Sequence, residues 1–235
     1  MTAFAGSARG KEWDVDFSDP KTSLLADMVQ DRQDSVALQL LVVGCGEGNE
    51  AAVLAQRLEA QVTGIDIVPH FDPRAAALVD LREGDATRME FDDQSFDFVY
   101  SFHALEHMGD YRAALREIHR VLKPGGGYLI GTPNRNRLIG YLGSKNTSVA
   151  EKMLWNIADW KAKWGGTFRN ELGAHAGYTM SELQAELEKV FACADSITSE
   201  YYLRLYPSWR PLIFLLYRTG LWQQLFPAIY FYGIR

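Results

Sequence analysis

The segment SFHALEH, residues 101–107, combines residue types and a spacing that could perform acid–base or metal chemistry. It contains H-x-x-E-H, the inverted zinc-peptidase signature, in which two histidines one helical turn apart bind a metal ion beside a glutamate. Such a match is a hypothesis until the surrounding fold supports it. The sequence offers no obvious third ligand on a helix, so a metallopeptidase is disfavoured and no metal site is predicted. His103, Glu106 and His107 remain candidate catalytic residues, with helix-surface and packing roles as the alternative for the two histidines.

A glycine-rich loop forms a second group of candidate functional residues. Gly44, Gly46 and Gly48 follow the apolar run LQLLVV at 38–43, and an alanine-rich helix is expected at 50–58. Glycines let the backbone turn tightly and approach a ligand more closely than a Cβ would permit. The spacing G-x-G-x-G differs from the dinucleotide-binding form G-x-G-x-x-G. A tight loop without a ligand is the alternative.

Two acids follow strand-like segments in positions that suit a nucleoside ligand. Asp66 lies near the end of QVTGIDI (61–67), 22 residues after Gly44, where a carboxylate can accept both ribose hydroxyls. Asp85 follows a third expected strand at 77–82 and could accept from an adenine amino group, with Ile67 and Ala86 as apolar walls. The alternatives are a solvated loop acid for Asp66 and a turn or cap residue for Asp85.

The expected elements bring these groups together. Further strands are predicted at 96–102 and 127–133, and a helix capped by Asp110 at 111–122. Strands that alternate with helices predict a mostly parallel sheet with helices on both faces. The ligand cleft of such a sheet lies beyond the carboxyl ends of its strands. The glycine loop, both acids and SFHALEH all lie at such ends.

Length and composition narrow the class of protein. The chain has 235 residues, 47% hydrophobic and 23% charged, which is typical of one globular α/β domain. A net charge of -6 argues against nucleic acid as a partner, because its binding uses clustered Lys and Arg. Two cysteines, Cys45 and Cys193, suggest no disulfide framework. No secretory signal and no membrane-spanning run is found, so a cytoplasmic location is expected.

Taken in order, the motifs resemble the class I S-adenosylmethionine-dependent methyltransferases, in their small-molecule, methyltransferase-type-11-like branch. The resemblance rests on LLVVGCGEG, GIDIV, GDATRMEFDDQSFDFVYSFHALEHM and REIHRVLKPGGGYLIGTPN; it covers 38–135 closely and 175–191 more loosely. It implies a Rossmann-like, doubly wound, seven-stranded sheet, mostly parallel with an antiparallel last strand, and helices on both faces. FPAIYFYGIR at 226–235 fits that last strand, and FACADSITSEYYL at 191–203 its neighbour.

The resemblance also implies the cofactor, S-adenosylmethionine, with S-adenosylhomocysteine as its product. The glycines would lie along the methionine part, Asp66 would bind ribose, and Asp85 with Ala86 would hold adenine. Val42 stands where the family usually has an acid, so the amino group of the cofactor would be recognised elsewhere. The predicted cofactor-binding set is Gly44, Cys45, Gly46, Gly48, Asp66, Ile67, Asp85, Ala86 and Ser101.

The chain is expected to form a single methyltransferase domain, 1–235, in four parts. These are an N-terminal helical cap (1–37), the cofactor-binding core (38–133), a lid or substrate insertion (134–178), and the C-terminal part of the sheet (179–235), with an aromatic helical insertion at about 207–225. In the insertion, Trp155, Trp160 and Trp164 have roughly helical spacing. They pack a helix on the core or cover an apolar acceptor. His175 is a fourth candidate base, with an ordinary loop role as the alternative.

The acceptor is expected to be small or lipid-like and to react through an oxygen or carbon nucleophile. By the resemblance, SFHA differs from the Asn/Asp-Pro-Pro-aromatic tetrad of methyltransferases that act on amino groups of nucleic-acid bases or glutamine. Residues 201–235 contain eleven aromatic residues, four arginines and no acid. This composition suggests peripheral contact with the inner face of a membrane or a lipid-linked acceptor, with a homodimer contact as the alternative. An NAD-dependent oxidoreductase and a non-catalytic S-adenosylmethionine-binding protein are the rival functions.

Overall fold

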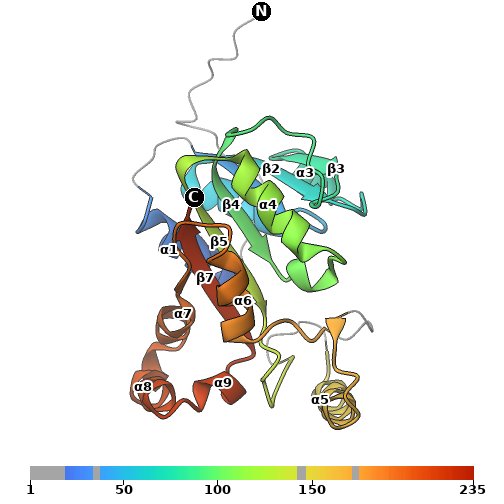
Figure 1. Cartoon of the computed structure of the whole chain (residues 1–235), viewed down its shortest axis with the longest axis vertical. Helices are drawn as coiled ribbons and strands as arrows, with labels where there is room; N and C mark the ends of the chain where they lie inside the picture. Colours follow the sequence, from blue (N-terminus) through green and yellow to red (C-terminus); the bar gives the residue numbers. More distant parts are fainter. Residues whose placement is uncertain (1–18, 34–37, 142–146, 171–174) are drawn as a thin grey trace, which may run out of the picture.

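The computed structural model describes residues 19–33, 38–141, 147–170 and 175–235, and within them a seven-stranded sheet forms the centre of the fold (Figure 1). The strands are β1 (Gln39–Val43), β2 (Gln61–Asp66), β3 (Asp80–Glu83), β4 (Phe96–Phe102), β5 (Leu122–Pro133), β6 (Asp195–Ser196) and β7 (Ala228–Ile234). Their order is β3-β2-β1-β4-β5-β7-β6; the first five pair in parallel, whereas β7 is antiparallel to both β5 and β6. The predicted fold class is confirmed.

Helices cover both faces of the sheet. Figure 1 shows α4 (Tyr111–Val121) and α6 (Met180–Leu187) in front of the strands, while α1 (Pro20–Gln30) lies behind and contacts α2 (Asn49–Leu58) and α7 (Thr198–Leu205). The remaining helices are α3 (Pro73–Ala76), η1 (Leu105–His107), α5 (Val149–Trp164), η3 (Pro207–Trp209), α8 (Arg210–Thr219) and α9 (Trp222–Leu225). Among the described helices, none is long and apolar enough to cross a membrane.

The central strand β1 sets the position of the site. Its residues Leu40 to Val43 are all buried, as expected of a parallel strand with helices above and below. In the register of the sheet, Val43 lies beside Ile65 of β2 and Ser101 of β4. The glycine loop after β1, Asp66 and the segment after β4 therefore emerge at the same edge.

Two expected strands have different bounds in the structure. The third begins at Asp80 rather than 77, because α3 and the turn after it take up the preceding residues. The expected strand at 191–203 is wrong over most of its length: only Asp195 and Ser196 pair with β7, and α7 begins at Thr198. The Thr198 hydroxyl accepts from the Tyr230 backbone N–H (2.9 Å) and donates to the Tyr230 carbonyl (3.2 Å), so a side chain replaces the strand ladder there.

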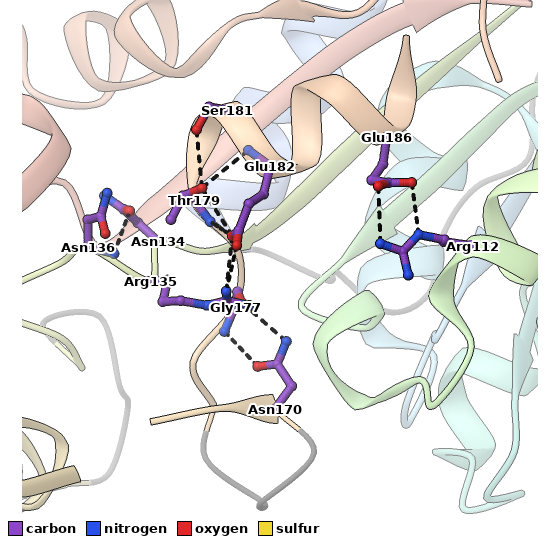
Figure 2. A network of polar contacts seen from close by, with 10 residues as sticks. All are labelled: Arg112, Asn134, Arg135, Asn136, Asn170, Gly177, Thr179, Ser181, Glu182 and Glu186. Carbon is purple, nitrogen blue, oxygen red and sulfur yellow. Dashed lines mark hydrogen bonds and ion pairs between the residues drawn. The ribbon is translucent and has the colours of Figure 1, made fainter. Parts of the chain in front are cut away.

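The first and last residues of the insertion at 134–178 lie side by side at the end of β5. Asn134 and Tyr178 form an isolated parallel bridge beside the end of β5. Figure 2 shows the polar contacts around the returning segment. Arg135 binds the Glu182 carboxylate at 2.9 and 3.0 Å and donates to the Gly177 carbonyl at 2.8 Å, while Asn170 accepts from the Gly177 N–H (2.8 Å) and donates to its carbonyl (3.1 Å). These bonds fix the backbone two residues after His175.

Gly177 provides a test of this junction. Its φ is +69°, and a Cβ added there would lie 1.8 Å from the Pro133 carbonyl oxygen. Gly166 has nearly the same φ, +70°, but a Cβ added there meets nothing within 4 Å. We expect Gly166→Ala to lower the free energy of unfolding by the roughly 1–2 kcal/mol of a left-handed alanine. Gly177→Ala should cost clearly more in denaturant titrations; equal losses would contradict the packing described.

The tryptophans of α5 do not pack on the core. Among the residues of this helix only Asn156 is buried, and Trp164 is 89% exposed. Trp160 donates its indole N–H to the Leu138 carbonyl at 2.6 Å. The core-packing interpretation of the three tryptophans is therefore wrong, because all three side chains are exposed.

Candidate active site

The glycine loop is tied to the end of β2. The backbone N–H groups of Gly44 and Cys45 both donate to the Ile65 carbonyl, at 2.9 and 3.0 Å. Gly46 donates to Oδ2 of Asp66 at 2.8 Å, and Oδ1 accepts from the Val68 N–H at 3.0 Å. Gly48 is the N-cap of α2. Asp66 thus holds the loop and stands at its open side, since a Cβ on Gly46 would meet nothing within 4 Å.

The loop also touches the histidine segment. Gly44 has a φ of +74°, and a Cβ there would lie 2.2 Å from the Cβ of Ala104. Only glycine fits this approach. The residue after His103 is therefore in contact with the first glycine of the loop, which joins the two groups of candidate residues.

The end of β3 completes the rim, which is the edge of the sheet formed by the carboxyl ends of β1, β2 and β3. The Gly84 N–H donates to the Asp66 carbonyl at 2.9 Å, which places Asp85 beside Asp66. Oδ1 of Asp85 accepts from the Thr87 backbone N–H (2.8 Å) and hydroxyl (2.7 Å), and these bonds lower the pKa of the Asp85 carboxyl. Ala86 is buried, whereas Ile67 is 69% exposed and offers an apolar surface next to both acids. This combination suits a nucleoside, whose ribose is polar and whose base is flat and apolar.

Buried polar atoms provide a test of whether a ligand fits this rim. Within the described residues, Ser101 Oγ and Asn49 Oδ1 are the buried side-chain polar atoms that have no hydrogen-bond partner. Ser101 is paired beside Val43, and Asn49 begins α2, so both flank the glycine loop. An unpaired buried group costs about 1–3 kcal/mol, which a polar ligand at the loop would offset. The residues present fit S-adenosylmethionine.

Cys45 contributes to the rim through its backbone. Its side chain is buried, and burial together with the charge of Asp66 raises the pKa of the thiol to about 12. The thiol is therefore protonated at neutral pH and unreactive.

The four candidate catalytic residues form a second cluster around Glu106. Oε1 of Glu106 lies 3.2 Å from His103 Nδ1 and 4.0 Å from His107 Nε2. Oε2 accepts from the Thr132 hydroxyl at 3.1 Å. The rings of His107 and His175 meet edge to face with their centroids 4.7 Å apart. The structure thus brings together residues from 103–107 and from the far end of the insertion.

Glu106 determines the tautomer of His103. Burial alone would raise the pKa of the Glu106 carboxyl, but the hydrogen bond from His103 and the nearby imidazoles outweigh it, so the pKa is lowered. An ionised carboxylate can only accept, so Nδ1 of His103 carries the proton. Nε2 of a neutral His103 then has a free lone pair, which suits a general base.

The H-x-x-E-H segment does not form the α-helix that the peptidase signature requires. His103 has a left-handed backbone, with φ of +51°, and only Leu105–His107 form a short 3₁₀ turn. The two histidines therefore do not share a helical face, and their assignment to a helix surface is wrong. In the part of the chain that the structure describes, no three His, Cys, Asp or Glu side chains are placed to hold a metal ion.

A cavity of about 790 Å³ opens beyond the ends of β4, β5 and β7, within the size range of small-molecule sites. His103 and His175 line it together with many aromatic side chains, and none of the described residues that line it is an acid. Its walls come from both ends of the chain and from the insertion: Lys21, Phe102, Pro133, Arg137, Tyr141, Trp155, Tyr201, Tyr202, Leu205, Tyr206, Ile213, Leu225, Phe226, Pro227, Ala228 and Tyr230. The sequence patterns pointed to Trp155 and the aromatic segment 201–235, but to neither Lys21 nor Arg137.

Arg137 is the buried cation of this cavity. It is 4% exposed, and its guanidinium binds Asp159 (3.0 Å) and the carbonyls of His175 (2.9 Å), Ala176 (3.2 Å) and Asn134 (3.2 Å). The donors of Arg137 are thus used to join α5 to the segment that carries His175. Its role is to shape the cavity and position His175.

The cluster predicts how stability depends on pH. The pKa of Glu106 is lower in the folded chain than its ordinary value of 4.5, so the stabilisation from this carboxylate is present above pH 4.5 and is lost as pH falls through the folded pKa. We expect Glu106→Gln to reduce the loss of unfolding free energy as pH falls from neutral through 4.5 and then through the folded pKa of Glu106. Burial, and then His107, lower the pKa of His175 from 6.5, which also favours the folded state at higher pH, but this side chain is exposed and its share is small. Denaturant titrations across this range measure both; an unchanged slope in Glu106→Gln would contradict the assignment.

The strand order with its reversed β7, the glycine loop and Asp66 at the end of β2 define the class I methyltransferase fold. The order differs from the 3-2-1-4-5-6 arrangement typical of dinucleotide-binding domains, which disfavours the oxidoreductase alternative.

Comparison with known proteins agrees with this class. Residues 41–130 match a family model described as the methyltransferase domain. A Mycolicibacterium smegmatis protein described as a probable S-adenosylmethionine-dependent methyltransferase is 38% identical over 100 residues, 41% of this chain and 38% of its own length. A demethylmenaquinone methyltransferase of Staphylococcus epidermidis is 39% identical over 94 residues, which are 37% of this chain and 39% of that protein. An O-methyltransferase of Penicillium expansum is 37% identical over 127 residues, which are 46% of each chain. The chain spans less than half the length of these curated relatives.

A solved structure extends the likeness of the fold. Phosphoethanolamine N-methyltransferase 2 of Haemonchus contortus, in complex with S-adenosyl-L-methionine, aligns with a TM-score of 0.57 and 18% identity over 90% of this chain and 52% of that one. Such identity shows the fold alone. Together with the family match, it confirms the class predicted from sequence: residues 41–130 carry an S-adenosylmethionine-dependent methyltransferase domain.

Proposed function

We propose that this protein transfers a methyl group from S-adenosylmethionine to a hydroxyl or an acidic carbon of a small, largely apolar acceptor. The observation that carries the proposal is the position of His103. Its neighbour Ala104 touches the first glycine of the donor loop, and its own side chain lines the aromatic cavity. A donor and an acceptor would meet at this residue.

The cofactor supplies a methyl group on a sulfonium sulfur, whose C–S bond breaks as the bond to the acceptor forms, leaving S-adenosylhomocysteine. The work of the chain is to align the two reactants and to remove one proton from the acceptor. Nε2 of His103 accepts that proton, and the imidazolium that results is stabilised by the Glu106 carboxylate 3.2 Å from Nδ1. Glu106 is a positioning residue, because it acts through His103.

The cavity favours an acceptor with an aromatic or lipid-like body. Tyr201, Tyr202 and Phe226 form part of a contiguous aromatic wall, with ring centroids 4.1 Å apart between Tyr202 and Phe226. Lys21 adds a cation at the wall besides the buried Arg137, and no acid is among the described residues that line the cavity. Phenols and hydroquinones with an apolar tail have this chemistry: an acidic hydroxyl that His103 can deprotonate, and a body that aromatic side chains cover.

Cofactor binding is the first experiment. We expect S-adenosylmethionine and S-adenosylhomocysteine to bind the ligand-free chain in calorimetric titration, and Asp66→Ala to weaken binding by about tenfold or more, because a hydrogen bond to a charged group contributes about 1.5–3 kcal/mol. Asp66→Asn separates the loss of charge from the loss of the bonds to the glycine loop. Asp92→Ala, which removes an exposed acid of the turn before β4, should bind as the parent does.

Each outcome of this titration decides something. No binding by the parent chain would overturn the proposal, and NAD would be titrated next. Binding without transfer to any of a panel of apolar phenols, hydroquinones and enolisable ketones would favour a non-catalytic S-adenosylmethionine-binding protein.

A further inference from the structure

Helix α8 has an unusual surface. Among its ten residues only Ile213 is buried. Phe214 is 57% exposed and Leu215 56%, and Trp209, just before the helix, is 61% exposed. Leu212, Tyr217 and Leu221 are also exposed. A run of large apolar side chains open to water on a short helix marks an interaction surface.

The positive charge of this surface indicates an anionic partner. Arg210 and Arg218 are exposed on α8, and the sequence from 201 to 235 contains no acid, although the whole chain carries a net charge of -6. The Arg218 guanidinium lies over the Phe214 ring, 5.9 Å from its centroid. Aromatic side chains interspersed with arginine are typical of helices that lie in the interface of an anionic bilayer.

The position of the helix connects this surface to the cavity. Figure 1 shows α8 and α5 at the same end of the molecule, beyond the carboxyl ends of the parallel strands. Ile213, the buried residue of α8, lines the cavity, as do Leu205 and Tyr206 just before it. On the other side Trp155 of α5 lines the cavity, while Met153 and Leu154 of that helix are 61% and 64% exposed. The cavity is therefore lined by two helices that both expose large apolar side chains.

We propose that η3 and α8 dock this protein onto an anionic lipid surface, so that an apolar acceptor passes from the bilayer into the cavity beside Ile213. A second copy of the chain fits the surface less well. In a two-fold contact the same patch meets itself, so the arginines of both copies would approach each other without an acid from 201–235 to pair with them. An anionic lipid surface satisfies both the arginines and the exposed aromatic residues.

The test is flotation of the full chain with vesicles of phosphatidylcholine alone or mixed with phosphatidylglycerol. We expect binding to the anionic vesicles that weakens with added salt. Arg218→Glu should lower the partition coefficient by more than the roughly fivefold that one arginine contributes. Arg116→Glu on α4 is the matched control, because it makes the same change of net charge at another exposed arginine and should leave binding within about twofold of that of the parent, since α4 lies away from the patch.

A second variant measures the contribution of the exposed apolar side chains to vesicle binding. Phe214→Ser with Leu215→Ser removes two exposed side chains that do not line the cavity, and we expect at least about a tenfold loss of vesicle binding. Circular dichroism shows whether each variant is folded, so this test stands apart from that of the proposed function. No binding of the parent to anionic vesicles, or equal losses for the two arginine variants, would overturn the proposal. A dimer in light scattering that Phe214→Ser dissociates, without vesicle binding, would assign the surface to a second copy instead.

Discussion

His103→Asn is expected to lower the turnover number for methyl transfer to a phenol or hydroquinone by about 10²–10⁴, the usual contribution of a general base. Asparagine is the appropriate replacement because His103 has a φ of +51°, and asparagine adopts left-handed backbone more readily than most residues. The affinity for S-adenosylmethionine should change little, since the glycine loop is retained. Single-turnover rates with radiolabelled cofactor measure the effect.

A variant of Glu106, the residue that binds His103, tests whether His103 is a general base or a packing residue. Glu106→Gln should slow transfer as well, because an amide at that position no longer requires Nδ1 of His103 to carry the proton. Since the two residues act as a unit, the double variant should be little slower than His103→Asn alone. His119→Asn, on α4 outside the cavity lining, is the control and should retain activity. Rates in His103→Asn equal to those of the control would remove His103 from the reaction.

Arg137→Met is expected to lower the free energy of unfolding by about 3–5 kcal/mol, the cost of breaking a buried ion pair from one side. The change would leave the carboxylate of Asp159 and the carbonyls of His175 and Ala176 without the guanidinium that binds them. Because these bonds also hold the segment of His175, the acceptor should bind more weakly in the folded variant.

Arg112→Met is the matched control for this variant. Arg112 forms a bidentate pair with Glu186 at 2.9 and 3.1 Å, but its side chain is 57% exposed. Pairs in water contribute about 0–1 kcal/mol, so its loss should be small. Denaturant titrations of the two variants side by side measure the difference; similar losses would show that Arg137 does not hold the insertion.

The cofactor half of the site could be predicted from sequence because its signals are local. An apolar run that ends in Gly44 and an acid that ends the next strand are enough to place the loop and Asp66 at one edge of a parallel sheet. The strand expected at 191–203 was implied by the family resemblance instead, and it is wrong over most of its length. There the side chain of Thr198 replaces the ladder to β7, an arrangement that depends on Tyr230, 32 positions away.

The acceptor half could not be predicted to the same degree because its contacts are distant in sequence. The left-handed conformation of His103 accompanies a bond from its N–H to the Gly131 carbonyl and the burial of Glu106 against Thr132. Lys21 precedes the core segment 38–133 in the sequence and Arg137 follows it, yet both residues line the cavity. Nothing in their local sequence indicates this position.

The cofactor half and the acceptor half of the site also differ in their similarity to the methyltransferase family. Of the residues that line the cavity, only Phe102 and His103 fall within 41–130, the stretch that matches the methyltransferase family; all the others lie outside it. Changes in the lining would therefore leave the donor machinery intact. A chimera that keeps 38–133 and takes the flanking segments of another methyltransferase should inherit the acceptor preference of the second protein, because the chain divides into a donor-binding segment and exchangeable segments that select the acceptor.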